Sequence, residues 1–363
     1  MQVQDSELLQ RIHGRLKKLY PDQHEQCAER LTTLLGRYGL GSSERSTPYQ
    51  WDQRDAILIT YGNSLQPSHP EESPLSTLHR FLTEQLQEAF NTVHILPFFP
   101  YSSDDGFSVT DYRRVNPDLG SWEDIQDLAD NYRLMVDLVL NHVSRQSEWF
   151  RNYERGRAPE SRYFIEVDPE TDLSQVVRPR STPLLTPVQT RHGKRHVWST
   201  FSDDQIDLDF SNPDVLFEFV DLLLYYIMQG ARLIRMDAIA YLWKKIGTSC
   251  IHLPETHEMV KLFRDIVELV APEVLLVTET NVPHEENISY FGDGDEAHIA
   301  YQFPLPPLLV HGLRRGTAAY LRKWAAGLGD IPDGCTFMNF TASHDGIGLR
   351  PAEGILPPEE IDA

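Results

Sequence analysis

Seven short apolar runs alternate with longer amphipathic stretches along this chain, and that alternation limits its possible folds more than any other feature. The runs are rich in aliphatic and β-branched residues and lie at residues 56–61, 93–99, 134–140, 231–236, 274–278, 299–303 and 337–340. Strands that alternate with helices indicate a parallel sheet. Because the runs are nearly continuous in apolar residues, we expect both faces of that sheet to be covered. The sequence therefore predicts an α/β fold, either doubly wound or a barrel.

The positions of the polar residues favour the barrel. They come at or just after the C-terminal ends of the expected strands: Asp137, Arg235, Asp237, Glu279, His344 and Asp345. A (β/α)8 TIM barrel builds its active site from the C-terminal ends of several strands. A doubly wound sheet more often carries a glycine-rich phosphate turn after its first strand, and residues 61–64 (YGNS) do not form one.

The chain divides into four parts on this interpretation. We expect a helical lead-in at 1–50, the first part of the catalytic barrel at 51–142, an inserted small domain after strand 3 at 143–202, and the remainder of the barrel at 203–363. Residues 143–202 are polar, aromatic and proline-bearing, without a sustained helical period. A stretch of that length is unusual as a single loop, which favours an inserted domain.

The last expected strand lies close to the end of the chain. Eighteen residues follow Asp345, too few for an eighth strand with its helix and a small C-terminal β domain. A barrel without its eighth strand would keep two unpaired edges. We therefore expect the eighth strand and the C-terminal β domain to be missing, so that the polypeptide is a fragment of a longer enzyme or is weakly stable and poorly active alone.

Charge and cysteine content narrow the choice of partners and compartment. The chain has 33 Lys and Arg against 54 Asp and Glu, a net charge of −21 that would repel nucleic acid and anionic membranes. No stretch approaches the roughly 20 apolar residues of a membrane span. Cys27, Cys250 and Cys335 are too scattered for a disulfide framework or a zinc site. We expect a cytoplasmic protein without nucleic-acid or membrane partners.

Three carboxyl groups on one barrel rim suggest glycoside chemistry. Arg235 shares a strand face with Asp237 and is expected to lower the pKa of Asp237, which favours an ionised nucleophile. Glu279 has no adjacent cation, so its protonated form is easier to keep. Such a pair, with Asp345 stabilising positive charge, is typical of retaining glycoside chemistry. Each motif alone also fits a structural role as a strand end, a helix cap, an ion pair or a turn.

Several motifs in order resemble the signature blocks of the α-amylase family of glycoside hydrolases and transglycosidases. The blocks are 137–142 (DLVLNH), 205–209 (QIDLD), 235–237 (RMD), Glu279 and 344–345 (HD). Within that family, 95–107 (ILPFFPYSSDDGF), 248–250 (TSC) and 305–308 (LPPL) resemble the sucrose phosphorylase subfamily, which includes phosphorylases of glucosylglycerate, glucosylglycerol and sucrose 6-phosphate. The similarity runs from about residue 55 to 359.

The resemblance implies a role for each matching residue. Asp237 would be the nucleophile, Glu279 the general acid/base and Asp345 the transition-state stabiliser. The residues that would shape the glucosyl subsite are Asp104, Phe107, His142, Arg235 and His344. Gln205, in the second block, and Tyr241, four residues after Asp237, are further candidates for substrate binding.

The implied reaction moves a glucosyl group from a small α-glucoside to Asp237 and then to inorganic phosphate, giving α-glucose 1-phosphate with retention. Sucrose and glucosylglycerate are equally favoured as substrates. The resemblance implies neither a metal nor another cofactor, and residues 293–296 (DGDE) are interpreted as a solvated loop because the later glutamate of a calcium loop is absent. Two alternatives stay open: an α-glucoside hydrolase or transglucosidase of the same family, and a truncated barrel with little or no catalytic activity.

A basic segment interrupts the acidic chain. Between residues 178 and 196 there is no acidic residue, and the segment contains Arg178, Arg180, Arg191, Lys194 and Arg195. Guanidinium groups suit phosphate and carboxylate, so these residues are a candidate anion site on the acceptor side. A solvated loop of the inserted domain is the other interpretation.

Overall fold

A parallel sheet of seven strands forms the centre of the computed structural model, which describes residues 3–38, 48–49, 51–86 and 88–361. Its strands, in their order across the sheet, are β1 (Ile57–Thr60), β2 (Thr92–Ile95), β3 (Arg133–Val139), β8 (Ala231–Asp237), β9 (Leu275–Thr278), β10 (Ile299–Tyr301) and β11 (Thr336–Met338). Each of the seven predicted runs overlaps one of these strands, so the parallel α/β fold is confirmed. Within the described residues, β1 and β11 are the two edge strands.

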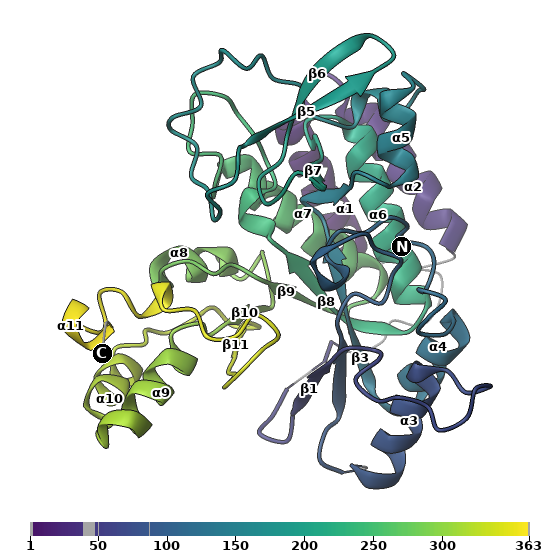
Figure 1. Cartoon of the computed structure of the whole chain (residues 1–363). Coiled ribbons are helices and arrows are strands. Elements are labelled where there is room, and N and C mark those ends of the chain that lie inside the picture. The colour runs from purple at the N-terminus through teal and green to yellow at the C-terminus, as the bar shows by residue number, and fades with distance from the viewer. Residues whose placement is uncertain (1–2, 39–47, 50, 87, 362–363) are drawn as a thin grey trace.

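The strands fan out in the order in which they occur along the chain. Figure 1 shows them passing from β1, at the bottom of the view, through β3 and β8 to β10 and β11 at the left. All neighbouring pairs are parallel, so their C-terminal ends meet at one edge of the sheet. Strand β2 ends before the run that predicted it, because Pro97 has no backbone N–H to donate to a ladder.

Helices lie between the strands in the sequence, except α11, which follows the last strand. They are α3 (Pro74–Gln85), α4 (Trp122–Asn131), α6 (Pro213–Met228), α7 (Pro254–Val270), α8 (His284–Ile288), α9 (Leu305–Arg315), α10 (Ala319–Ala326) and α11 (Pro358–Ile361). Their starts carry local signals: Ser73 caps α3 by accepting from the Ser76 N–H, and Ser121 and Asp124 form a capping box on α4. None of the helices that the structure describes combines the length and the apolar character that a membrane span requires.

Two N-terminal helices pack on the outside of this layer. Helix α1 (Val3–Leu19) contacts α7, and α2 (His24–Tyr38) contacts α6. Ile12 and Leu16 bury their side chains, while Arg15 reaches Asp265 with its Nε 2.6 Å from Oδ2. Residues 39–47 and 50 of the expected lead-in lie outside the described residues.

The acidic turn at residues 293–296 is not the solvated loop that the sequence suggested. Asp295 accepts from Arg15 at 3.1 Å and pairs with Lys261 at 3.0 Å. Glu296 is buried and lies 2.8 Å from Nδ1 of His257. The turn therefore joins α1 and α7 through ion pairs, because cations distant in the sequence fold against it.

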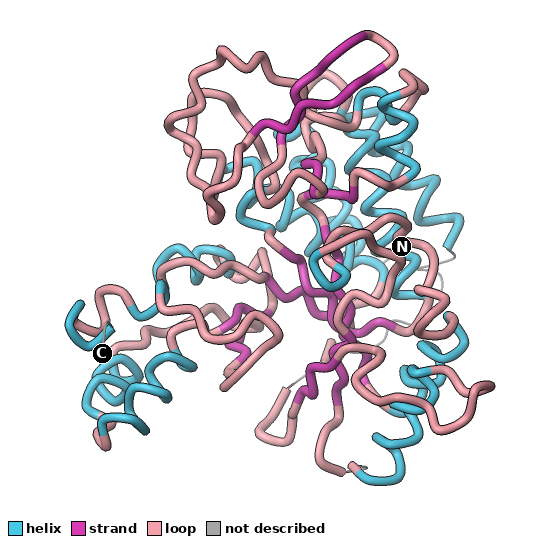
Figure 2. Tube along the Cα trace, in the orientation of Figure 1, coloured by secondary structure: helices cyan, strands magenta, loops and turns pink. Residues whose placement is uncertain are grey.

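The chain leaves the sheet between β3 and β8. This excursion contains α5 (Glu148–Glu154) and two antiparallel pairs: β4 (His142–Ser144) with β7 (Gln205–Asp207), and β5 (Leu185–Thr190) with β6 (Gly193–Trp198). Figure 2 shows that loops make up much of the remainder, and Figure 1 places the β5–β6 hairpin at the top of the view, far from α9 and α10.

Lys244 anchors the base of this excursion to the segment after β8. Its Nζ lies 2.7 Å from Oδ2 of Asp207 and donates to Oδ1 of Asn141 at 2.5 Å, and its side chain is only 3% exposed. Removing one member of a buried ion pair leaves the other charge unpaired. We expect Lys244→Met to lower the free energy of unfolding by about 3 kcal/mol, measured by urea denaturation followed by circular dichroism.

The neighbouring lysine provides the control for this prediction. Lys245 is 64% exposed and lies 3.8 Å from Glu255, so Lys245→Met should change the free energy of unfolding by less than about 0.5 kcal/mol. Equal effects of the two substitutions would show that the buried pair does not hold the excursion to the sheet.

Candidate active site

A cavity of about 430 Å³ lies at the C-terminal ends of the strands. Every residue that the sequence assigned to catalysis or glucosyl binding lines it: Asp104, Phe107, His142, Gln205, Arg235, Asp237, Tyr241, Glu279, His344 and Asp345. They come from strand ends and from the loops that follow, far apart in the sequence. The loop that carries His344 and Asp345 reaches the cavity although β11 ends six residues before His344.

Strand β8 places Arg235 and Asp237 on one face because residues i and i+2 of a strand point to the same side. Nη1 of Arg235 donates to Oδ1 of Asp237 at 2.7 Å and to Oδ1 of Asp137 at 2.6 Å. Asp137 is on β3, directly opposite Arg235 in the register, and also accepts from Nε2 of His94 at 2.7 Å. One guanidinium thus bridges two carboxylates, and the second of them has a partner of its own.

Burial changes the expected effect of Arg235 on its neighbour. Burial is the largest influence on Asp237 and raises its pKa, although Arg235 opposes the change. Burial also acts against the charge of Asp137, but His94 and Arg235 outweigh it and lower the pKa of Asp137 to about 2. The sequence suggested that Arg235 lowers the pKa of Asp237. Arg235 does act in that direction, but burial and the nearby Asp137 carboxylate outweigh it, so the net shift is upward.

Glu279 follows β9 and lies beside Asp237. Its backbone N–H donates to the carbonyl of Met236 at 3.2 Å, and its Oε2 accepts from the N–H of Ala238 at 3.2 Å. Burial is the main cause that raises the pKa of Glu279 to about 7; Asp237 and Asp345 add to it, and Arg235 opposes it. A carboxyl group with that pKa can hold a proton near neutral pH and give it away.

Backbone strain is concentrated at this cavity. Among the described residues, five that are not glycine have a positive φ, and three of these line the cavity: Asp104 (57°), Asp105 (46°) and Ala238 (50°). Such conformations cost free energy and persist where the surrounding structure holds them, commonly at functional sites. The glycine after Asp105 is required, because a Cβ on Gly106 would lie 2.7 Å from the carbonyl oxygen of Pro97.

Two stacked rings form part of one wall of the cavity. The ring of His344 stacks on Phe107, with centroids 5.2 Å apart and planes 8° apart. Burial lowers the pKa of His344, so its neutral ring has one donor and one acceptor nitrogen, and its buried Nδ1 has no hydrogen-bond partner among the described residues. Gln205 donates from Nε2 to Oδ2 of Asp104 at 2.8 Å and lies 3.1 Å from Nε2 of His142. These groups place polar atoms beside the stacked rings.

The basic segment does not gather into one site. Arg180 lines the cavity, but the other four residues do not. Arg191 and Lys194 are exposed on the β5–β6 hairpin, and Nε of Arg195 pairs with Glu166 at 3.2 Å. Nη2 of Arg178 donates weakly to Thr182 at 3.4 Å. The hairpin therefore carries part of the cluster away from the cavity.

Some lining residues were not found from the sequence. Tyr61 directly follows β1, so the strand-end rule used for the other strands could have identified it; its ring meets His344 edge-on at 6.5 Å. Thr280, Asn281 and Val282 follow Glu279. Arg350 comes from the segment after Asp345, and no local pattern in the sequence marks it.

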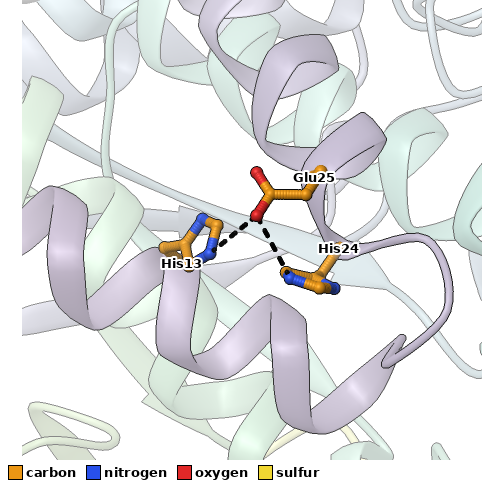
Figure 3. Close-up of side chains that lie close together, drawn as sticks. All are labelled: His13, His24 and Glu25. Atoms are coloured by element: carbon orange, nitrogen blue, oxygen red, sulfur yellow. Dashed lines mark ion pairs between the residues drawn. The ribbon is translucent and has the colours of Figure 1, made fainter.

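Possible metal ligands group elsewhere. Within residues 3–38, 48–49, 51–86 and 88–361, the one group of three His, Cys, Asp or Glu side chains with ligand atoms within 4.8 Å of one another is His13, His24 and Glu25 (Figure 3). Nε2 of His13 and Nε2 of His24 lie 3.6 and 3.3 Å from Oε1 of Glu25. None of the three lines the cavity described above.

The fold and the cavity define an α/β protein whose site is built from buried carboxyl groups at the ends of parallel strands. Residues 86–324 match the family model described as alpha amylase, catalytic domain. The chain therefore belongs to the alpha-amylase family, which confirms the resemblance of its ordered motifs.

Several individual proteins are similar to the chain over most of its length. It is 53% identical over 358 residues to the glucosylglycerate phosphorylase of Spirochaeta thermophila, covering 98% of this chain and 60% of that protein. It is 52% identical to the glucosylglycerate phosphorylase of Allomeiothermus silvanus, covering 98% and 63%. A crystal structure of sucrose 6F-phosphate phosphorylase from Thermoanaerobacter thermosaccharolyticum is similar with a TM-score of 0.75 and 26% identity, covering 86% of this chain and 64% of that one. The chain thus spans about three fifths of the length of these relatives.

Proposed function

We propose that this protein is a retaining glycoside phosphorylase that transfers the α-glucosyl group of glucosylglycerate to inorganic phosphate. The observation that carries the proposal is the pair formed by Asp237, held by Arg235, and Glu279, whose pKa is about 7, in one cavity at the strand ends. The relatives named glucosylglycerate phosphorylase, at 52–53% identity, support the choice of glucosylglycerate over sucrose.

The reaction proceeds in two displacements at the anomeric carbon. The Asp237 carboxylate attacks that carbon while Glu279 gives its proton to the glycosidic oxygen, so the carbon–oxygen bond breaks and glycerate leaves. The intermediate is a glucosyl ester of Asp237. A phosphate oxygen then attacks the same carbon, the ester bond breaks, and the proton of the phosphate passes to Glu279. Two inversions give α-glucose 1-phosphate with net retention. Asp345 stabilises the positive charge that develops on the sugar ring, and Arg180 attracts the anionic acceptor.

The same proposal extends to the architecture. The seven strands correspond to seven strands of a (β/α)8 barrel, with 51–142 and 203–363 as its two parts. Residues 143–202, between β3 and β8, correspond to an inserted domain, and 1–50 to a helical lead-in. The antiparallel β5–β6 pair, which lies within 143–202 and stands apart from the main sheet, supports the inserted domain.

Inorganic phosphate separates this proposal from the alternatives of a hydrolase and an inactive fold. We expect α-glucose 1-phosphate to form from glucosylglycerate only when phosphate is present, as measured by coupled phosphoglucomutase assay, with little product from sucrose. Glucosylglycerol, a neutral analogue, serves as the matched comparison. Glucose released at the same rate without phosphate would indicate a hydrolase, and absence of any turnover would contradict the proposed activity of this chain.

A further inference from the structure

We propose that Arg350 is the residue that recognises the carboxylate of the glyceryl group and so selects an anionic over a neutral glucoside. This assignment rests on the proposed function, and it names a specificity-determining residue that is separate from the residues of the two displacements.

The backbone of Arg350 is anchored although its side chain is exposed. Arg350 opens a short 3-10 turn (Arg350–Ala352) in which Pro351 and Ala352 are buried. Ala352 packs in a small apolar cluster with Leu308 of α9 and Leu356. The turn is thereby fixed against a helix of the main layer, and the Arg350 side chain lines the cavity from there. A fixed backbone reduces the entropy that is lost when the guanidinium binds a ligand.

Arg350 lies on the side of the cavity that the leaving group must occupy. The general acid protonates the leaving oxygen, so the leaving group lies next to Glu279. Arg350 and Glu279 both act on the phenol of Tyr241, whose pKa rises to about 12 chiefly through burial. In addition, a Cβ on Gly348 would lie 3.4 Å from Nδ2 of Asn281, so the backbone just before Arg350 runs beside the segment that follows Glu279.

The cavity is lined by more acidic than basic side chains, so an anionic ligand needs a cation to bind there. Its lining includes five acidic side chains: Asp104, Asp105, Asp237, Glu279 and Asp345. Arg235 is already bonded to two carboxylates. Arg180 and Arg350 also line the cavity, and neither has a salt bridge within the described part of the chain. A neutral glyceryl group could enter without them, whereas a carboxylate would be repelled by the acidic lining.

The geometry of the ligand favours an arginine for this role. A guanidinium presents its N–H groups as a planar fork that matches both oxygens of a carboxylate. Phosphate arrives after glycerate has left and can use Arg180. Arg180 therefore binds phosphate, and Arg350 binds the carboxylate that distinguishes glucosylglycerate from glucosylglycerol.

Ligand binding to a protein that cannot turn the substrate over tests this assignment. In the Glu279→Gln background, calorimetry would measure the affinities for glucosylglycerate and for glucosylglycerol, with and without Arg350→Gln. We expect Arg350→Gln to weaken glucosylglycerate binding by about 30-fold and glucosylglycerol binding by less than about threefold. Arg350→Lys should recover part of the loss, because it keeps the charge without the fork. Arg322→Gln, an exposed arginine on α10, is the matched control and should change neither affinity.

Each other outcome overturns the assignment. Equal losses for both glucosides would mean that Arg350 shapes the cavity without reading the carboxylate. Unchanged glucoside affinities together with a raised KM for phosphate in otherwise unmodified Arg350→Gln protein would assign Arg350 to phosphate instead. If the Glu279→Gln protein with Arg350 intact binds neither glucoside, the proposed function itself is wrong; if it binds both equally, the proposed function can stand but the selectivity does not.

Discussion

Glu279→Gln should lower kcat/KM for glucosylglycerate by roughly 10³-fold but should largely spare a substrate whose leaving group needs no proton. Glutamine has the same size as glutamate, and its side-chain oxygen can still accept the hydrogen bond from the Ala238 N–H. It has no acidic proton to transfer. Fluoride leaves without protonation, and phosphate is already an anion, so its attack does not depend on Glu279 accepting its proton. We therefore expect phosphorolysis of α-glucosyl fluoride to stay within about tenfold of the unmodified protein, measured by fluoride release.

The role of Glu279 as a general acid predicts how kcat/KM changes with pH. Burial, with help from Asp237 and Asp345, raises the pKa of Glu279 to about 7, so the group is protonated below that pH and ionised above it. A general acid acts in its protonated form. With glucosylglycerate, log kcat/KM should therefore fall with a slope of about −1 as the pH rises beyond about 7. With α-glucosyl fluoride and Glu279→Gln, that alkaline limb should disappear.

An exposed glutamate near the site supplies the control. Glu285 on α8 is exposed, and Glu285→Gln should leave both substrates and the pH profile unchanged. Equal losses with glucosylglycerate and with α-glucosyl fluoride would contradict a proton-transfer role and would point to disturbed packing. An unmoved alkaline limb in Glu279→Gln would assign that limb to another group.

The strands and the core of the site follow from local patterns. Apolar runs bounded by polar residues identify strands because a buried parallel strand must be apolar on both faces. Strand ends then identify the cavity, since parallel strands bring their C-terminal ends to one edge. The lining residues Arg235, Asp237 and Glu279 were found in this way. Tyr61 obeys the same rule and could have been included.

The remaining features depend on contacts that are distant in the sequence. Asp295 was interpreted as solvated because its partners Arg15 and Lys261 lie far away in the chain and meet it only after folding. The net direction of the Asp237 pKa depends on burial and on the sharing of Arg235 with Asp137, neither of which spacing reveals. Arg350 reaches the cavity because its turn packs on α9, and no motif around it predicts that contact.

Asp237→Asn should abolish glucosyl transfer, with a fall in kcat/KM of at least about 10⁴-fold, because an amide does not form the glucosyl ester. Both glucosylglycerate and α-glucosyl fluoride should be affected, since both need the nucleophile. Glu279→Gln, in contrast, should largely keep its activity on α-glucosyl fluoride, so the two variants distinguish the nucleophile from the general acid. The fold should persist, because Arg235 keeps its 2.6 Å hydrogen bond to Asp137.

Asp237→Asn should also affect the stability of the folded protein. Burial raises the pKa of Asp237, so its ionised form costs free energy in the folded state above that pKa, and a neutral amide removes this cost. The free energy of unfolding at pH 7 should therefore rise or stay unchanged in Asp237→Asn, in a trade of stability for function.

Without phosphate, Glu279→Gln treated with α-glucosyl fluoride should accumulate a glucosyl adduct on the peptide containing Asp237, detected by mass spectrometry. The double variant Asp237→Asn, Glu279→Gln should show none; an adduct there, or on another peptide, would assign the nucleophile to a different residue.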